Sequence, residues 1–405
     1  MDFSYTKRTT DLLQKIRQFM EEDILPLEAE LLHSLGVKNH GSDWKKWEVH
    51  PKVELLKAKA KSQGLWSLFL PENHGGQITN LEYSTLAEEM GRSMIAPPIF
   101  NCNAPDTGNM EVFVKYGSDE MKEQWLKPLM DGTIRSAFCM TEPDVASSDA
   151  TNMKATAKLD GDEVVLNGKK WWTTGIGHPN CKVIIFMGLT HPDAHRREQH
   201  SMVVVPVETP GVEIVRMLSV FGDYDEPYGH GEVHFNNVRV PAKNIILGPG
   251  RGFEIAQGRL GPGRIHHCMR CIGAAERALE LMIKRGLERT AFGKQIIDLG
   301  GNHERIANCR VAIDQARLLT LHAAWKIDNH GVRKSIGDIS AIKIAAPNML
   351  QMVVDEAIQM FGGMGVSHDS PLSSLFLAAR TLRLADGPDA VHRSLLARYE
   401  LKKYR

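Results

Sequence analysis

The residues best suited to chemistry lie in one stretch near the C-terminus, QMFGGMGVSHDSPLSSLFLAARTLRLADGPDAVH, which covers residues 359–392. The glycine cluster at its start removes side chains where a backbone must adopt unusual dihedral angles or lie against a flat ligand. In the second turn, Pro388 suits the first position of a helix, Gly387 suits the cap, and Asp386 comes just before the cap. A carboxylate in that place can point into a pocket. We therefore interpret the stretch as a cofactor-binding turn followed by a general base.

Asp386 has a rival carboxylate three residues later, at Asp389. Asp389 would lie in the first turn of the helix, where the helix dipole favours the ionised form and a capping role is the simpler interpretation. An exposed aspartic acid has a pKa near ~3.9, whereas burial beside apolar groups raises that pKa and makes the carboxylate a competent base. We predict that Asp386 is the catalytic residue.

Composition limits the classes of protein to consider. The chain has 405 residues, of which 42% are hydrophobic and 24% charged, so it can bury a large core and should form two or three structural units. Lys+Arg and Asp+Glu both number 49, and this balance favours neither nucleic acid nor an anionic membrane as a partner. The N-terminus lacks a secretory h-region, and no run of about eighteen apolar residues occurs, so we expect a cytoplasmic protein.

The cysteines and histidines do not indicate a metal centre. The six cysteines stand in apolar or helical contexts instead of forming a disulfide framework, so we expect reduced, structural thiols. Cys268 and Cys271 form a CxxC pair, but one pair inside a helical pattern is weak evidence for zinc or redox chemistry. His303 and Glu304 begin the zinc-protease pattern HExxH without completing it. No metal site is predicted.

Residues 1–133 have the apolar spacing of packed helices. The spacing predicts a helix over residues 6–25 that Pro26 ends, because proline lacks the N–H that a helix interior needs. Asn80 is suited to cap a second helix, and Ser118 is suited to cap another whose first turn is acidic. We therefore predict an N-terminal helical domain.

Residues 134–246 have a different sequence pattern, in which short runs of β-branched and apolar residues predict strands. Asp160-Gly161 and Asn167-Gly168 are strong signals for tight turns, so at least some of these strands should pair antiparallel. The pattern predicts a middle antiparallel β domain.

Residues 247–405 return to helical spacing. Their first part, GPGRGFEIAQGRLGPGR over residues 248–264, is interpreted as a hinge, and apolar residues from Ile265 onward repeat at helical intervals. The glycines of the hinge lack the spacing and the βαβ setting of a dinucleotide-binding motif. The predicted fold is therefore α+β, with a C-terminal helical bundle after the β domain.

Several motifs together resemble the flavin-dependent acyl-CoA dehydrogenase family. They are IQMFGGMG with an acid and a glycine about twenty residues later, TEP within FCMTEPDVASSD at 138–149, WTT at 172–174, and RTAFG at 289–293. The family usually has Glu-Gly-Thr where this chain has Asp-Gly-Pro at 386–388, so the carboxylate is kept on a side chain one methylene shorter. The order of helical, β and helical parts is similar to that of the family, so the resemblance covers essentially the full length. In its motifs the chain is most similar to the dehydrogenase portion of family members ten and eleven.

The resemblance implies FAD as the cofactor and an acyl-CoA thioester as the substrate, and it assigns residues to each. The implied cofactor-binding residues are Phe138, Met140, Thr141, Ser148, Trp172, Thr173, Thr174, Arg289, Phe292, Gln359, Phe361, Gly362, Gly363, Pro388, Asp389 and Ala390. The implied substrate-binding residues are Ser148, Gly261, Pro262, Gly263, Arg264 and Gly387. Arg289 lies in a segment that resembles the one by which the family grips FAD from a neighbouring subunit, and this resemblance implies a homodimer or homotetramer.

The implied reaction is α,β-dehydrogenation, in which Asp386 takes the α-proton, the flavin takes the β-hydride, and an electron-transfer flavoprotein receives the electrons. Some relatives carry the base just before the arginine that corresponds to Arg264, but that position is Gly263 here. Two alternatives remain: a flavin oxidase acting on another carbon acid, as the aspartate-dependent nitroalkane oxidases do, and a non-catalytic flavoprotein that binds a partner. The length, branching and hydroxylation of the acyl group stay open.

Overall fold

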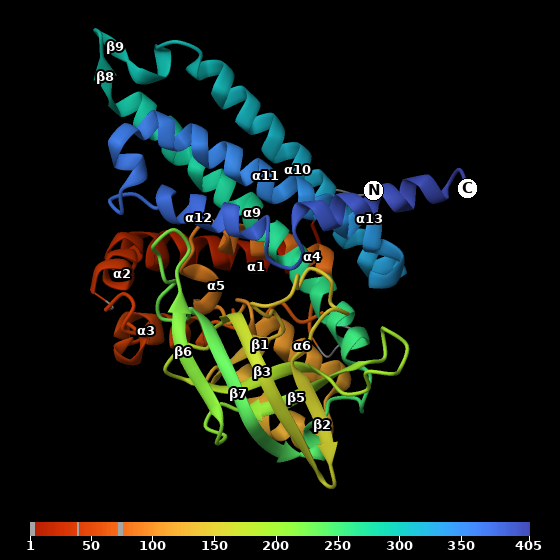
Figure 1. The fold of residues 1–405 in the computed structure, drawn as a ribbon. Helices are drawn as coiled ribbons and strands as arrows, with labels where there is room; N and C mark the ends of the chain where they lie inside the picture. The colour runs from red at the N-terminus through yellow and green to blue at the C-terminus, as the bar shows by residue number, and fades with distance from the viewer. Residues whose placement is uncertain (1–4, 39, 72–75) are drawn as a thin grey trace. The chain divides into compact units, whose positions relative to one another are not determined.

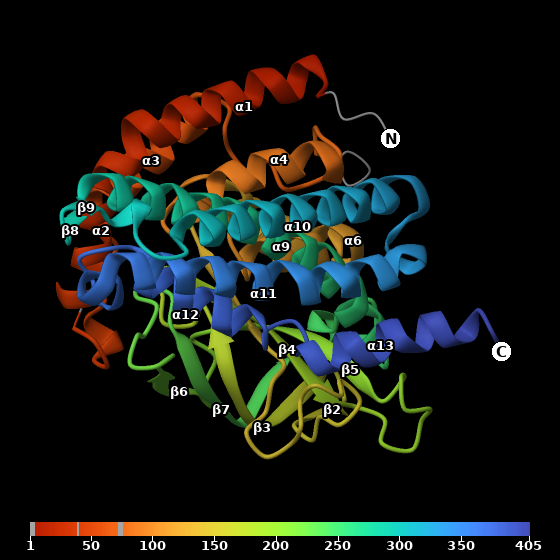
Figure 2. The same ribbon diagram turned by 90° about the horizontal axis from the view of Figure 1, so that it is seen from above.

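The computed structural model describes residues 5–38, 40–71 and 76–405, and its ribbon is shown in Figures 1 and 2. Contacts divide the chain into two compact units. The helical unit comprises Met1–His33, Leu55–Phe100 and Gly261–Arg405, and the sheet unit comprises Ser34–Glu54 and Asn101–Leu260. The predicted combination of N-terminal helices, a middle sheet and C-terminal helices is confirmed. The α-helices along the chain are α1 (Lys7–Phe19), α2 (Leu25–Lys38), α3 (Pro51–Ser62), α4 (Asn80–Met90), α5 (Ala96–Ile99), α6 (Asp106–Tyr116), α7 (Asp119–Met121), α8 (Lys127–Asp131), α9 (Gly252–Glu288), α10 (Asn302–His330), α11 (Ile336–Phe361), α12 (Leu372–Leu382) and α13 (Asp389–Lys402).

Helix α11 is at the centre of the C-terminal helices, because it packs against α10, α12 and α13 within the helical unit. Figure 2 shows α10 and α11 running side by side along most of their length. The buried apolar residues of α11 recur at intervals of three and four, which is the spacing of one helix face. They are Ile339, Ile342, Ala346, Met349, Leu350, Val353, Val354, Ala357 and Met360. The predicted chemistry lies in the turns that follow α11 and α12, and both helices are packed against each other.

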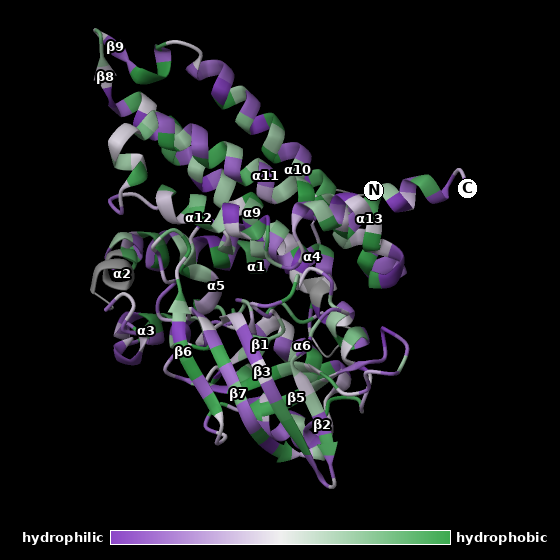
Figure 3. Cartoon of the chain, viewed as in Figure 1, coloured by the Kyte–Doolittle hydropathy of each residue, from purple (hydrophilic) through white to green (hydrophobic). Residues whose placement is uncertain are grey.

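The sheet unit is built on a seven-stranded sheet in the order β1-β4-β2-β3-β7-β6, with β5 also pairing with β4. Its strands are β1 (Arg135–Cys139), β2 (Thr156–Asp160), β3 (Glu163–Thr174), β4 (Cys181–Leu189), β5 (His200–Pro206), β6 (Val212–Leu218) and β7 (His230–Pro241). Most pairings are antiparallel, as expected, but β1 and β2 each pair with β4 in parallel. Hydrophobic and hydrophilic residues alternate along β3, β6 and β7 in Figure 3, which is the pattern of strands with one buried face.

The two predicted turns in the sheet have different outcomes. Asp160-Gly161 does join β2 to β3, and Asp160 pairs with Glu163 across the hairpin. The predicted turn at Asn167-Gly168 is wrong, because both residues lie inside β3 at a β-bulge. Gly168 has φ +137°, and a Cβ there would lie 2.5 Å from the Cβ of Ala155, so the glycine permits a bulge and a close approach instead of a chain reversal.

The predicted end of the first helix at Pro26 is also wrong. The chain continues from α1 through a π-helical turn, Met20–Ile24, directly into α2, where Pro26 is the second residue. The same arrangement recurs at Pro128, which is the second residue of α8 and follows the π-helical turn Lys122–Leu126. A proline clashes with the carbonyl four residues earlier and donates no hydrogen bond. The wider π spacing accommodates both defects, so the helix direction continues.

The predicted hinge over residues 248–264 is wrong over most of its length, because α9 begins at Gly252 and is continuous to Glu288. Its glycines serve close packing instead of flexibility. A Cβ on Gly258 would lie 2.2 Å from the hydroxyl oxygen of Tyr116, and one on Gly261 would lie 2.6 Å from a methyl group of Val332. Helix propensity alone disfavours glycine, but any larger residue at these positions would force Tyr116 or Val332 to shift.

Two predicted helix caps were tested by the structure. Ser118 caps α7 as expected, since its hydroxyl accepts a hydrogen bond from the Met121 N–H. Asn80 is wrong as a cap: Thr79 caps α4 and forms a capping box with Glu82, while Asn80 is the first helical residue.

All six cysteines are buried and none forms a disulfide. Over the described part of the chain, no helix is both long enough and apolar enough to span a bilayer.

Candidate functional site

Asp386 lies in the turn between α12 and α13, within the helical unit. Its φ of +56° is a left-handed conformation that few non-glycine residues adopt. Two side chains fix this backbone: Arg264 Nε donates to the Asp386 carbonyl at 2.9 Å, and His392 Nε2 donates to the same oxygen at 3.3 Å. A strained residue held from two sides is typical of a functional position.

The carboxylate of Asp386 faces helix α9. Its Oδ2 lies 3.6 Å from His267 Nε2, and a Cβ placed on Gly263 would also lie 3.6 Å from Oδ2. The side chain is 20% exposed. Gly263 is therefore next to the carboxylate of Asp386, and the lack of a side chain there leaves room for that carboxylate.

Gly387 and Arg264, two of the predicted substrate-binding residues, lie around the turn that contains Asp386. Gly387 has φ +102°, and a Cβ there would lie 2.9 Å from His392 Nε2, so a larger residue would be strained and would force His392 or the turn to shift. Burial lowers the pKa of His392 to about 4, and burial also lowers the pKa of Arg264. Arg264 donates from Nε to the Asp386 carbonyl and so holds the turn that contains Asp386. Gly261, Pro262 and Gly263 lie within α9, just before Arg264.

Asp389 has a different environment, although it lies only three residues from Asp386. It is the first residue of α13, with Pro388 at the cap position and Ala390 next in the helix. This placement shifts the predicted cap by one residue, from Gly387 to Pro388. Its Oδ2 accepts hydrogen bonds from Arg383 Nε at 2.9 Å and Asn348 Nδ2 at 3.2 Å, and its side chain is 11% exposed. The expected capping role is wrong, because the start of α13 has no side-chain capping hydrogen bond, and the carboxylate of Asp389 instead binds Arg383 and Asn348.

The hairpin after α9 carries the predicted arginine and phenylalanine. Strands β8 (Thr290–Ala291) and β9 (Lys294–Gln295) pair around Phe292, which is 96% exposed at φ +53°. Arg289 is exposed at the base of the same hairpin. The hairpin therefore presents Phe292 and Arg289 to solvent in this chain.

The end of α11 carries the other predicted residues of the helical unit. Gln359, Gly362 and Gly363 are exposed, and the ring of Phe361 lies 5.3 Å from the guanidinium of Arg285. The chain leaves the helix through Gly362, whose φ is +65°. The structure thus brings this glycine turn to the end of a rigid helix.

The motif at 138–149 belongs to the sheet unit and is anchored by a buried ion pair. Lys170 Nζ on β3 donates to the Glu142 carboxylate at 2.7 Å and to the Met140 carbonyl at 2.9 Å. The same carboxylate accepts the backbone N–H groups of Lys154 and Ala155. Burial lowers the pKa of Lys170. Glu142 therefore fixes the loop that follows β1.

The other predicted residues of this motif lie around that anchor. Phe138 on β1 lies under the Arg259 guanidinium, 3.9 Å from the ring centroid, in a cation–π contact. The Thr141 carbonyl accepts the Trp171 N–H at 3.0 Å, which places the loop alongside β3. Ser148 is exposed in the loop. The motif thus presents its backbone beside the edge of β3.

A second β-bulge in β3 turns Trp172 outward. The register shifts between Lys170 and Thr173, and Trp172 has φ +51° with 40% of its surface exposed. The Thr173 hydroxyl points the other way and lies 3.4 Å from Cys139 Sγ in the core. The Thr174 hydroxyl lies 2.9 Å from His230 Nδ1. An exposed indole beside an oriented hydroxyl offers a flat face and a polar edge to a ligand.

Three residues near these sites were missed by the sequence reasoning: His267, His230 and Lys170. His267 lies three residues after Arg264 on the same helix, so its spacing from Arg264 could have indicated that both side chains face Asp386. His230 is opposite Thr174 in the β3–β7 ladder, and nothing in the sequence fixes that register across 56 residues. Lys170 lies beside the two tryptophans of a predicted strand, but its partner is 28 residues away.

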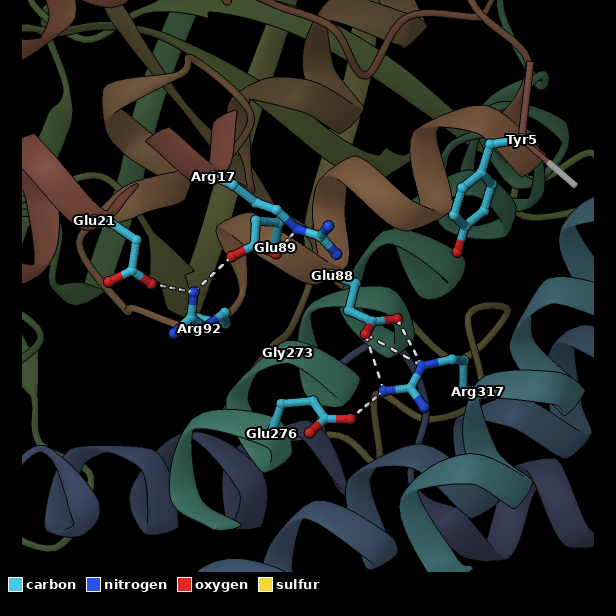
Figure 4. Close-up of a pocket in the computed structure, with 9 residues that line it drawn as sticks. All are labelled: Tyr5, Arg17, Glu21, Glu88, Glu89, Arg92, Gly273, Glu276 and Arg317. Carbon is cyan, nitrogen blue, oxygen red and sulfur yellow. Dashed lines mark hydrogen bonds and ion pairs between the residues drawn. The ribbon is translucent and has the colours of Figure 1, made fainter. Parts of the chain in front are cut away.

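A separate pocket of about 530 Å³ lies in the helical unit, and it contains none of the predicted site residues. Figure 4 shows its lining, in which glutamates and arginines alternate. Arg317 forks onto Glu88 at 3.0–3.1 Å and also pairs with Glu276, while Arg92 bridges Glu21 and Glu89. The pocket is therefore an ion-pair network between helices. Among the residues that the structure describes, no group of three or more His, Cys, Asp or Glu side chains could hold a metal ion.

Comparison with known proteins gives consistent results along the whole chain. Models described as acyl-CoA dehydrogenase N-terminal, middle and C-terminal domains match residues 6–133, 137–238 and 250–401. Acyl-CoA dehydrogenase family member 11 of Gallus gallus is 53% identical over 401 residues, which cover 98% of this chain and 51% of that protein. The chain thus spans about half the length of this relative.

Two solved structures extend the comparison. A Mycobacterium abscessus protein, provisionally assigned as an acyl-CoA dehydrogenase, is 59% identical with a TM-score of 0.96, and both chains are covered completely. Glutaryl-coenzyme A dehydrogenase in complex with glutaryl-CoA is 26% identical with a TM-score of 0.84, over 99% of this chain and 97% of the other.

Proposed function

The chain belongs to the acyl-CoA dehydrogenase family, and from this premise we propose that it catalyses FAD-dependent α,β-dehydrogenation of an acyl-CoA thioester. The observation that carries the proposal is the placement of Asp386. Its backbone is held in a left-handed turn by Arg264 and His392, and its carboxylate faces Gly263. The solved complex of glutaryl-coenzyme A dehydrogenase with glutaryl-CoA supports a thioester as the substrate class.

The described residues fit a flavin. The exposed indole of Trp172 and the adjacent Thr174 hydroxyl suit the face and edge of an isoalloxazine ring. The backbone after β1, fixed by Glu142, suits the ring edge that gains negative charge on reduction. Arg289 offers a guanidinium whose geometry matches a pyrophosphate. When bound, FAD supplies the acceptor for the hydride that leaves the β-carbon.

The role of this chain in the reaction is to remove the α-proton. The α C–H bond breaks, its proton passes to a carboxylate oxygen of Asp386, and its electron pair forms the new double bond as the β-hydride departs. A base must be held in a fixed place for this step to be efficient. Arg264 and His392 provide that restraint through the Asp386 carbonyl.

The assembly and the electron acceptor are part of the same proposal. The exposure of Arg289 and Phe292 on the β8–β9 hairpin supports a homodimer or homotetramer in which this hairpin reaches the FAD of another subunit. We also propose an electron-transfer flavoprotein as the acceptor and a cytoplasmic location, which the balanced charge of the chain permits.

The test is anaerobic mixing of the FAD-loaded protein with saturated acyl-CoA thioesters of several chain lengths, with bleaching of flavin absorbance as the readout. We expect bleaching by at least one thioester and at least ~10²-fold slower bleaching in Asp386→Asn, which keeps the shape of the side chain but cannot accept the proton. Asp389→Asn is the matched control and should mainly loosen the start of α13. Bleaching by a nitroalkane but by no thioester would overturn the proposal in favour of an oxidase.

A further inference from the structure

The end of β3 and the start of β7 bring three side chains together in the sheet unit. Thr174 and His230 are directly opposite in the ladder, and the Thr174 hydroxyl oxygen lies 2.9 Å from His230 Nδ1. The imidazole is tilted against the indole of Trp172, with the ring centroids 5.7 Å apart. On its other side, His230 Nε2 lies 3.7 Å from Asp225 Oδ2. His230 therefore contacts two of the residues assigned to the flavin without being one of them.

The charge state of this imidazole follows from its surroundings. The side chain of His230 is 13% exposed, and burial lowers its pKa to about 4 although the carboxylate of Asp223 opposes the shift. His230 is thus neutral above about pH 5, with one nitrogen that donates and one that accepts. Partial burial and the carboxylate of Asp223 raise the pKa of Asp225 to about 7, so Asp225 is ionised at about pH 8.

An ionised carboxylate can only accept, so it favours the tautomer in which Nε2 carries the hydrogen. The separation of 3.7 Å is too long for a hydrogen bond, and the effect of Asp225 is one of charge. Nδ1 is then the acceptor, and the Thr174 hydroxyl donates its only hydrogen to Nδ1. The lone pairs of the Thr174 oxygen remain for a group on the other side of the hydroxyl.

We propose that His230 is a positioning residue that fixes the Thr174 hydroxyl as a hydrogen-bond acceptor toward the flavin, and thereby favours the reduced cofactor. The proposal rests on the assignment of FAD in the proposed function. A reduced isoalloxazine ring carries an N–H that the oxidised ring lacks, so an acceptor oxygen at its edge stabilises the reduced form selectively. Loss of one neutral hydrogen bond should change the ratio of the two flavin states about threefold to tenfold. For a two-electron couple this corresponds to ~14 to ~30 mV.

The test measures the midpoint potential of the bound flavin at about pH 8, together with FAD affinity and the thermal unfolding midpoint. His230→Phe keeps an aromatic ring beside Trp172 but removes both nitrogens, and we expect a lower potential by the stated amount. Asp225→Asn should shift the potential in the same direction by less, because the imidazole is no longer biased to one tautomer. Asparagine tolerates the left-handed backbone of Asp225, at φ +55°, so this variant keeps the test available if His230→Phe does not fold.

A double-mutant cycle separates positioning from architecture. In a Thr174→Val background, His230→Phe should no longer change the potential, because the hydroxyl that transmits its effect is absent. His234→Phe, on the same strand, is the matched control and should leave the potential unchanged, since His234 contacts Glu232 instead. An unchanged or raised potential in both His230→Phe and Asp225→Asn, or a shift that persists in the Thr174→Val background, would overturn the proposal. Wild-type protein that binds no FAD would instead refute the proposed function.

Discussion

Glu111 on α6 offers a direct test of the buried electrostatics of the sheet unit. The residue is 2% exposed, and neither carboxyl oxygen has a hydrogen-bond partner among the residues that the structure describes. Burial raises its pKa from the ordinary 4.5 to about 8, against the opposing charges of Lys115 and Arg259. Glu111 is therefore a neutral carboxylic acid in the folded protein at neutral pH.

The sign and size of the effect follow from linkage between protonation and folding. A raised pKa in the folded state contributes stability that is complete below pH 4.5 and is lost as the pH rises through about 8. Between about pH 5.5 and about pH 7.5, the two pKa values give a loss of roughly 2–3 kcal/mol in the free energy of unfolding. Glu111→Gln keeps the shape of the side chain without a titrating group, so its stability relative to wild type should increase by that amount over the same range.

The assay is equilibrium urea unfolding of both proteins at the two pH values, followed by tryptophan fluorescence. Glu213→Gln, at an exposed position on β6, is the matched control and should show the same difference from wild type at both pH values. A Glu111→Gln difference that changes by less than about 0.5 kcal/mol, or that favours wild type as the pH rises, would refute the reasoning. In that case the carboxylate must be stabilised in its ionised form.

Two further variants test the supports of the predicted site. Lys170→Met should leave the carboxylate of Glu142 buried without its cation and destabilise the protein by roughly 3–5 kcal/mol. The thermal unfolding midpoint should fall, and adding Glu142→Gln to the same chain should partly restore it. Gly387→Ala should slow thioester-dependent flavin bleaching and have a smaller effect on FAD binding. The added Cβ would lie 2.9 Å from His392 Nε2 and displace the turn that holds Asp386. An unchanged bleaching rate would contradict this prediction.

Local patterns predicted the elements of this fold, but glycine and proline misled the prediction of their boundaries. Asp160-Gly161 and Ser118 were right because a hairpin turn and an N-cap depend on a few neighbouring residues. Gly168 and Gly258 carry the same sequence signal as turn glycines, yet each is required by a group distant in sequence, Ala155 and Tyr116 respectively. A single sequence does not show which kind of glycine is present.

The same distinction applies to the site. The turn that contains Asp386 could be predicted, with its cap misplaced by one residue, because the turn, the helix start and the carboxylate are adjacent in sequence. The pairing of Thr174 with His230 could not, because it depends on the register of β3 against β7 and on a bulge at Trp172 that shifts this register. A displacement of one residue would turn the imidazole to the other face of the sheet. Sequence reasoning therefore located a group set by one turn, whose catalytic role stays a prediction, and missed a group set by the register of two strands.

Asp386 and Asp389 show how the fold assigns different roles to similar residues in one short segment. The carboxylate of Asp389 is used by Arg383 and Asn348, which bind it at the start of α13. At Asp386, Arg264 and His392 bind the backbone carbonyl, and the carboxylate is directed toward α9. The left-handed φ of +56° makes this possible, because it turns the carbonyl and the side chain to different partners. The conformation of the turn thus distinguishes the two carboxylates, because Arg383 and Asn348 bind that of Asp389 whereas that of Asp386 faces α9.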